Sequence, residues 1–218
     1  MTEPLSGKPL LKRSLLLCFG LAVMALGVAL SIKADLGTSP ISSTPYVVSL
    51  ISAISVGTAT ILINAFLLLG EVLIMRRQFH AVQFLQLAVV ILFGWLIDLF
   101  LWALGGLTYA DYGQQWLICI AGILILGIGV SFEVTANLIP LPGEGLILSL
   151  CTVLPIKFGS MKVIIDVSLV IVAVLLSFLF LGGLFGVREG TVAAAICVGL
   201  VAKSVNRVIR PLERRLTE

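Results

Sequence analysis

Four carboxylic acids lie deep within apolar stretches of the sequence, where an ionised group is costly. Asp98 stands in FGWLIDLFLW, Glu133 in GVSFEVTAN, Glu144 in IPLPGEGLIL and Asp166 in KVIIDVSLVI. A charge at the centre of a bilayer costs roughly 2.5–3.5 kcal/mol on insertion scales, so such groups face one another or a wet cavity. We therefore predict that Asp98, Glu133 and Asp166 are buried charges that bind a proton or another cation.

Five further charged side chains lie near the ends of the apolar stretches: Lys33, Asp35, Glu71, Lys162 and Lys203. At such positions a long side chain can equally extend to the membrane surface and keep its charge in water. Among these residues we predict that Lys33 and Asp35 bind the substrate, with Lys33 as its counter-charge, and that Lys203 is a coupling or buried charge.

Two proline-led stretches combine small, hydroxyl and acidic residues, GTSPISSTP at 37–45 and PLPGEGL at 140–146. Proline suits the first turn of a helix, because its missing N–H costs nothing there. We predict that each stretch begins a short helix whose N-terminal amides favour an anionic group. The predicted substrate-binding residues are Ser39, Thr44, Gly143 and Glu144. The alternative is that proline and glycine merely permit a tight loop.

Signatures of soluble enzymes are missing from the sequence. It contains no GxxxxGK[ST], HExxH or GxSxG motif. The single histidine, His80, cannot make a multi-histidine metal site, and the four cysteines have no CxxC spacing. We therefore predict no enzymatic activity, no metal and no cofactor.

The composition indicates that lipid is the solvent around most of the chain. Hydrophobic residues make up 60% of the 218 positions, charged residues 11%, and the mean hydropathy is +1.19. A soluble domain has roughly a quarter of its residues charged. The basic C-terminal stretch KSVNRVIRPLERRL suits anionic lipid headgroups, and a net charge of only +3 gives no support for binding nucleic acid.

Six apolar segments are long enough to cross a bilayer, near 15–32, 59–75, 84–104, 116–132, 163–181 and 191–209. Two shorter ones, near 40–54 and 142–154, would reach only ~22 Å as helices, less than the ~30 Å hydrocarbon core. We predict an all-α integral membrane protein with six transmembrane helices and two re-entrant half-helices. All 218 residues would form a single membrane domain.

The basic residues support this topology. With six spans and both termini in the cytoplasm, twelve of the fourteen Lys and Arg residues lie on the cytoplasmic side, all except Lys33 and Arg188. This distribution obeys the positive-inside rule. If the short helices also crossed, Arg76 and Arg77 would lie outside.

The two halves of the chain resemble each other, about 12–104 and about 114–210. At an offset of 100 residues, LGVALSIK at 26–33 matches LGIGVSFE at 126–133, and Pro40 matches Pro140. At other offsets Asn64 matches Asp166, and Asp98 matches Lys203. Three spans per half would place the second half upside down, as in many transporters. The alternative is chance similarity between apolar stretches.

Two of these matches exchange the sign of a charge, Lys33 with Glu133 and Asp98 with Lys203. Equivalent positions near a two-fold axis can meet across it, and opposite charges there would neutralise each other. We predict that at least one of the two pairs is in contact.

The motifs IKADLGTSP at 32–40 and Gly57–Thr58 in the first half resemble the YczE/YyaS/YitT family of bacterial multi-pass membrane proteins. In the second half LPGEGL at 141–146, FGSMKVIIDVSL at 158–169 and GVREGT at 186–191 are similar to one branch of that family. The similarity covers about 15–206. It implies a bacterial plasma-membrane protein, with transport often presumed.

The leading functional hypothesis is a transporter of a small polar or charged solute, coupled to protons or to another cation. The alternatives are a non-transporting accessory or scaffold protein and a passive channel. The expected partners are the lipid bilayer and a small-molecule or ion substrate, and assembly into a homo-oligomer is left open.

Overall fold

The protein is built from α-helices joined by short connections. The computed structural model describes residues 7–217, so residues 1–6 and 218 of the predicted membrane domain lie outside this range. The helices are α1 (Gly7–Ala34), α2 (Pro40–Ser52), α3 (Val56–Met75), α4 (Leu85–Ala103), α5 (Tyr112–Ala136), α6 (Pro142–Val153), α7 (Phe158–Leu181) and α8 (Glu189–Thr217). Two short 3₁₀ helices, Arg76–Gln78 and Ala81–Phe84, connect α3 to α4.

Six helices of the described chain are long and apolar enough to cross a bilayer. The candidate spans are Leu10–Ala34, Val56–Gln78, Ala81–Ala103, Tyr112–Ala136, Phe158–Leu181 and Glu189–Ile209, each of 21–25 residues. At ~1.5 Å per residue each of them exceeds the ~30 Å core of a bilayer. The predicted multi-pass, all-α architecture is therefore confirmed.

The outward faces of these helices carry large apolar side chains. Phe66, Trp102 and Leu179 are 70%, 80% and 76% exposed, respectively. Surfaces of this kind on so many neighbouring helices imply contact with lipid acyl chains rather than water.

Helices α2 and α6 are much shorter than the six spans, at 13 and 12 residues. Both begin with a proline, Pro40 and Pro142, which occupies the first helical turn. At ~1.5 Å per residue they extend for less than ~20 Å. The predicted starts of the two short helices are therefore confirmed.

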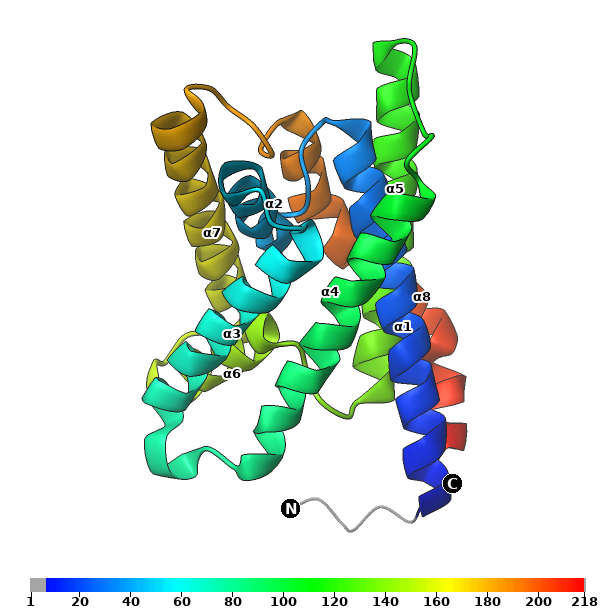
Figure 1. Ribbon diagram of the computed structural model, residues 1–218. Coiled ribbons are helices and arrows are strands. Elements are labelled where there is room, and N and C mark those ends of the chain that lie inside the picture. Colours follow the sequence, from blue (N-terminus) through cyan, green and yellow to red (C-terminus); the bar gives the residue numbers. More distant parts are fainter. Residues whose placement is uncertain (1–6, 218) are drawn as a thin grey trace.

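The chain changes direction repeatedly between two ends of the molecule (Figure 1). The start of α1, the end of α8 and the turn between α3 and α4 lie at the lower end of the view. The connections from α4 to α5 and from α7 to α8 lie at the upper end. Arg76 and Arg77 therefore share one end of the molecule with both ends of the described chain.

Helices α1 and α5 pack closely through small residues, which allow two backbones to approach in a membrane. A methyl group added to Gly27 would lie 2.5 Å from the amide nitrogen of Leu126, and one added to Gly20 would lie 3.0 Å from that of Glu133. As residue numbers rise along α1 they fall along α5, so the two helices are antiparallel. The contacting pairs are Gly20–Glu133, Met24–Gly129, Gly27–Leu126 and Ser31–Gly122.

The helix boundaries of the two halves recur at an offset of 102 residues. Helices α1 and α5 end at Ala34 and Ala136, α2 and α6 begin at Pro40 and Pro142, and α3 and α7 begin at Val56 and Phe158. The residues after α1 and α5, Asp35 and Asn137, both have a positive φ, 54° and 45°.

This offset corrects the sequence alignment of the first helices, which used an offset of 100 residues. At 102 residues the counterpart of Glu133 is Ser31, and the counterpart of Lys33 is Thr135. The helices are unbroken over these segments, so no insertion can restore the earlier pairing. Apolar similarity alone did not distinguish the two alignments.

The predicted contacts between charges of opposite sign are wrong. In the part of the chain that the structure describes, the ion pairs are Lys162–Asp166 at 3.3 Å and Arg188–Glu189 at 3.2 Å. Lys203 is exposed on α8, and Asp98 accepts hydrogen bonds from the start of α3 instead. The pairs Lys33–Glu133 and Asp98–Lys203 therefore do not form.

Candidate functional site

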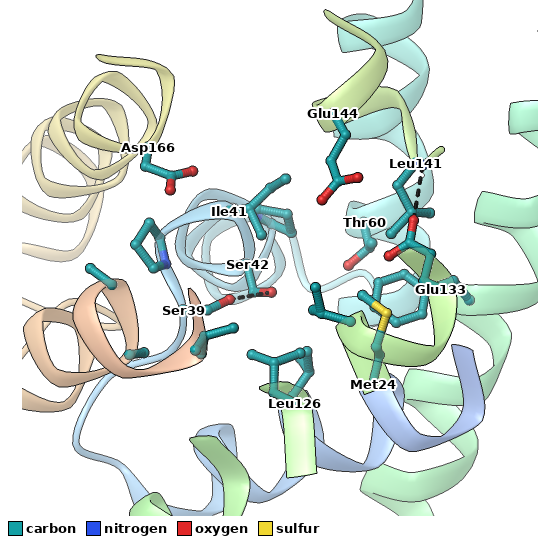
Figure 2. A pocket seen from close by; sticks show the side chains of 18 of the residues that line it. Met24, Ser39, Ile41, Ser42, Thr60, Leu126, Glu133, Leu141, Glu144 and Asp166 are labelled. Carbon is teal, nitrogen blue, oxygen red and sulfur yellow. Dashed lines mark hydrogen bonds between the residues drawn. The ribbon is translucent and has the colours of Figure 1, made fainter. Parts of the chain in front are cut away.

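A cavity of ≈ 150 Å³ lies where the N-terminal ends of α2 and α6 approach α3, α5 and α7. Ser42 of α2 and Glu144 of α6 line its wall, together with the residues just before these helices, Ser39 and Leu141. Figure 2 shows these residues around one opening. A cavity of ~150 Å³ can hold a molecule about the size of benzene. This cavity, called the central cavity below, therefore suits only a small solute.

Four ionisable side chains line the central cavity: Glu133, Glu144, Lys162 and Asp166. Figure 2 shows the carboxyl groups of Glu133, Glu144 and Asp166 arranged around the opening. Glu133 is only 5% exposed, and its Oε1 accepts a hydrogen bond from the amide of Leu141 at 3.2 Å. The Glu133 carboxyl therefore holds the start of α6 against α5.

Lys162 and Asp166 lie one turn apart on α7, with Nζ of Lys162 3.3 Å from Oδ2 of Asp166. The other oxygen, Oδ1 of Asp166, is buried without a hydrogen-bond partner. Three carboxylates and one ammonium leave two negative charges in excess when all four groups are ionised. An excess of negative charge in a partly buried cavity favours a cation.

Three neutral polar side chains of the central cavity each donate one hydrogen bond to another protein atom. Thr60 Oγ1 donates to the carbonyl of Val56 at 2.8 Å, and Asn64 Nδ2 donates to the carbonyl of Thr60 at 2.9 Å. Ser39 Oγ donates to Ser42 Oγ at 3.0 Å. The side-chain oxygens of Thr60 and Asn64 thus remain able to accept hydrogen bonds from a solute.

Most of the cavity wall consists of positions that correspond between the halves at the offset of 102 residues. The pairs are Met24 and Leu126, Val28 and Val130, Ser39 and Leu141, Ser42 and Glu144, Thr60 and Lys162, and Asn64 and Asp166. At three of these pairs the first half supplies a neutral polar residue and the second half a charged one. The cavity is thus symmetric in position but asymmetric in charge.

Of the residues predicted from sequence, Ser39, Glu133, Glu144 and Asp166 line the central cavity. Two of the other substrate-site candidates lie close to it but face neighbouring helices. Thr44 is buried and donates to the carbonyl of Leu169 on α7 at 2.8 Å. Gly143 packs against the side chain of Ile41, where an added methyl group would collide.

Lys33 and Asp35 lie at the end of α1 and are not in the cavity wall. Asp35 is exposed, and its carbonyl accepts a hydrogen bond from the Arg188 guanidinium at 2.8 Å. Backbone hydrogen bonds from Thr38 to Gly186 and from Gly190 to Leu36 join the same two segments, at 3.2 and 2.8 Å. The motifs IKADLGTSP and GVREGT therefore pack against each other.

Asp98 lies outside the cavity wall and caps the first turn of α3. Its Oδ1 accepts a hydrogen bond from the amide of Gly57 at 2.7 Å, and its Oδ2 accepts one from Ser55 Oγ at 2.6 Å. Exposed amides at a helix start favour an acceptor, and a negative charge there is favourable as well.

We expect Asp98→Ala to lower the free energy of unfolding by roughly 1–2 kcal/mol, the usual effect of losing a helix cap. Unfolding in mixed detergent micelles measures the change. Asp98→Asn keeps one acceptor oxygen and should lose less. If Asp98→Ala unfolds like the wild-type protein, the cap does not contribute to stability.

Four residues of the central cavity were not predicted from the sequence to belong to one site: Ser42, Thr60, Asn64 and Lys162. In the sequence Lys162 lies near the end of an apolar segment, and Asn64 stands out only as a match to Asp166. A usable signal was present, because Thr60 and Asn64 have the same four-residue spacing as Lys162 and Asp166. That spacing places each pair on one helix face.

Comparisons with known proteins agree with the resemblance seen in the motifs. The profile of a family described as "Family of unknown function (DUF6198)" matches residues 11–207. The uncharacterized protein YyaS of Bacillus subtilis (strain 168) is 27% identical over 130 residues. That alignment covers 59% of this chain and 63% of YyaS, so the chain spans less than two thirds of this relative. No solved structure matches the chain.

Proposed function

Because the chain belongs to the family of unknown function DUF6198, we propose its function from geometry alone, as a transporter of a small polar or charged solute. In this proposal the solute crosses the plasma membrane of a bacterium and binds in the central cavity on the way. The observation that carries the proposal is the cavity itself, a charged space inside a membrane protein, walled by equivalent positions of both halves.

We infer that the two halves form an inverted repeat. Helices α1 and α5 occupy equivalent places and run antiparallel. The contacts between these two helices are also symmetric. At the offset of 102 residues, the counterparts of Gly20 and Glu133 are Gly122 and Ser31, and these two residues contact each other as well. Transporters with inverted repeats place the substrate site between the repeats and expose it alternately to the two sides. The central cavity has that position.

Helices α2 and α6 fit the role of re-entrant half-helices. Each is too short to cross the hydrocarbon core and is preceded by irregular backbone. Irregular backbone at membrane depth is tolerated only where it is buried in protein or lines a cavity. The residues before the two helices, Ser39 and Leu141, both line the central cavity.

The charge of the cavity supports a solute that is positively charged or rich in N–H donors. Glu133, Glu144 and Asp166 outnumber the one ammonium group of Lys162. A proton or a second cation on one of these carboxyls would then couple its own movement to that of the solute.

Flux into proteoliposomes tests the proposal. Purified full-length protein would be reconstituted and supplied with labelled small amines, amino acids and sugars, with and without an imposed proton or sodium gradient. We expect saturable uptake of a small cationic solute above that of protein-free vesicles. Unsaturable ion conductance would instead indicate a channel, and no flux of any solute would favour an accessory or scaffold protein.

The proposed orientation of the membrane protein predicts which turns are accessible from outside the cell. We expect a cysteine placed at Asp111 to react with an impermeant maleimide in intact cells, and one at Gln78 to react only after permeabilisation. The four native cysteines would first be replaced by alanine. Labelling of Gln78 in intact cells would place the basic turn outside and contradict the cytoplasmic termini.

A further inference from the structure

A second cavity, of ≈ 250 Å³, is lined by residues of α6 that differ from those lining the central cavity. Glu144 of α6 lines the central cavity, whereas Gly145, Ser149 and Thr152 line the second one. The opposite wall comes from the end of α3, which carries Glu71, and from the start of α4. Among the residues that the structure describes, none lines both cavities.

Glu71 is a buried acid without a cationic partner. It is only 1% exposed, and its carboxylate accepts hydrogen bonds from Gln83 Nε2 at 2.9 Å and from Gln86 Nε2 at 3.1 Å. Across the described residues, no Lys, Arg or His nitrogen forms an ion pair with it. Two neutral amides satisfy some of its lone pairs but leave its negative charge uncompensated, which is costly away from water.

Gln86 adds an independent sign that something is bound here. Its side chain is also 1% exposed, and its Oε1 has no hydrogen-bond donor. Buried side-chain oxygens nearly always have a partner, and an exception points to an unseen water, ion or ligand. Both oxygens, of Gln86 and of Glu71, face the position where a side chain on residue 145 would be.

The hydroxyl groups of α6 on this cavity can only accept hydrogen bonds from an occupant. Ser149 Oγ donates to the carbonyl of Gly145 at 2.9 Å, and Thr152 Oγ1 donates to the carbonyl of Ser149 at 2.7 Å. Each hydroxyl has one hydrogen, so only its lone pairs remain. With Glu71 and Gln86 they offer a set of oxygen ligands, which is the preference of hard cations and of ammonium groups.

We propose that Glu71, Gln86, Ser149 and Thr152 form a second binding site, which takes a small monovalent cation, either an inorganic ion or a primary ammonium ion. Such a cation neutralises Glu71 and supplies the missing partner of Gln86 at the same time. Gly145 keeps the site open, because an added methyl group would collide with the Glu71 carboxylate. The site concerns binding and does not depend on the transport proposed above.

Equilibrium binding to the purified full-length protein tests the site. The probes are ²²Na⁺ and ¹⁴C-methylammonium, with ionic strength held constant by N-methyl-D-glucamine chloride. We expect Glu71→Gln to weaken binding of the preferred probe at least tenfold, and Ser149→Ala and Thr152→Val to weaken it severalfold. The probe with the higher affinity distinguishes an inorganic ion from an ammonium ion.

Glu189→Gln is the control, since it removes an exposed carboxyl that pairs with Arg188 outside both cavities and should leave cation binding unchanged. Glu71→Gln binding both probes like the wild-type protein would overturn the proposal, as would a wild-type protein that binds neither. A negative result in these binding experiments would count against the second site alone. An absence of flux in proteoliposomes would count against the transport proposed for the central cavity.

Thermal unfolding separates binding from a purely structural role of Glu71. We expect the preferred cation to raise the unfolding temperature of the wild-type protein and to have no such effect on Glu71→Gln. Without added cation, Glu71→Gln should be at least as stable as the wild-type protein, because an uncompensated buried charge is gone. The site would be overturned if Glu71→Gln is less stable than the wild-type protein and cations do not change the unfolding temperature of the wild-type protein.

Discussion

We expect Glu144→Gln and Asp166→Asn each to reduce saturable solute uptake at least ~30-fold, because losing one partner of a buried charge pair costs roughly 2–5 kcal/mol. Both carboxyls line the central cavity, and Oδ1 of Asp166 is buried without any partner from the protein. Each substitution keeps the size of the side chain and removes its negative charge. Uptake of a labelled small amine into proteoliposomes, normalised to folded protein, is the measurement.

The control for this prediction is Glu189→Gln, which removes an exposed carboxyl paired with Arg188 outside the cavity. A sharper control moves a carboxyl within the cavity. Asn64 is the counterpart of Asp166, so the double variant Asn64→Asp with Asp166→Asn keeps the cavity charge. We expect it to recover part of the uptake lost in Asp166→Asn. Full uptake in the two single variants would exclude both carboxyls from the transport site.

The close approach of α3 and α4 at Gly57 predicts the largest effect on stability. An added methyl group would collide with the carbonyl oxygen of Gly94 and lie 2.5 Å from Oδ2 of Asp98. Because the obstacle is backbone, it cannot turn aside as a flexible side chain would. We expect Gly57→Ala to lower the free energy of unfolding by about 3 kcal/mol, at the upper end of the usual range for overpacking.

Gly159 provides a matched control within the same chain. It is the counterpart of Gly57 and, like it, occupies the second position of its helix. A methyl group on Gly159 would have no neighbour within 4 Å. Since alanine is a better helix former than glycine by ~0.8–1.0 kcal/mol in helix interiors, we expect Gly159→Ala to be neutral or slightly stabilising. Equal losses from both substitutions in mixed detergent micelles would contradict the predicted collision.

The features that could be predicted from sequence are those that depend on neighbouring residues along the chain. The lengths of the apolar segments indicated six spans, and six candidate spans are present in the described chain. Proline positions predicted the starts of α2 and α6, at Pro40 and Pro142. These signals are local, because hydrophobic length and the missing N–H of proline act on a helix whatever packs against it.

The composition of the site was predictable only in part. Ionisable residues in apolar stretches pointed to Glu133, Glu144 and Asp166, which line the central cavity, and equally to Asp98, which caps α3. The cost of burying a charge indicates that it needs a partner but does not say which one. For Asp98 the partners are the amide of Gly57 and the hydroxyl of Ser55.

The sequence by itself determined the helices, their number and the class of protein, whereas the tertiary structure alone decided which polar side chains share a cavity. The two-residue difference between the alignment offsets of 100 and 102 illustrates the reason. At 3.6 residues per turn it corresponds to a rotation of about 200° around a helix, enough to move Lys33 to the opposite face from the counterpart of Glu133. In an apolar helix nearly every register satisfies hydropathy, and only packing against glycines such as Gly122 and Gly129 selects one.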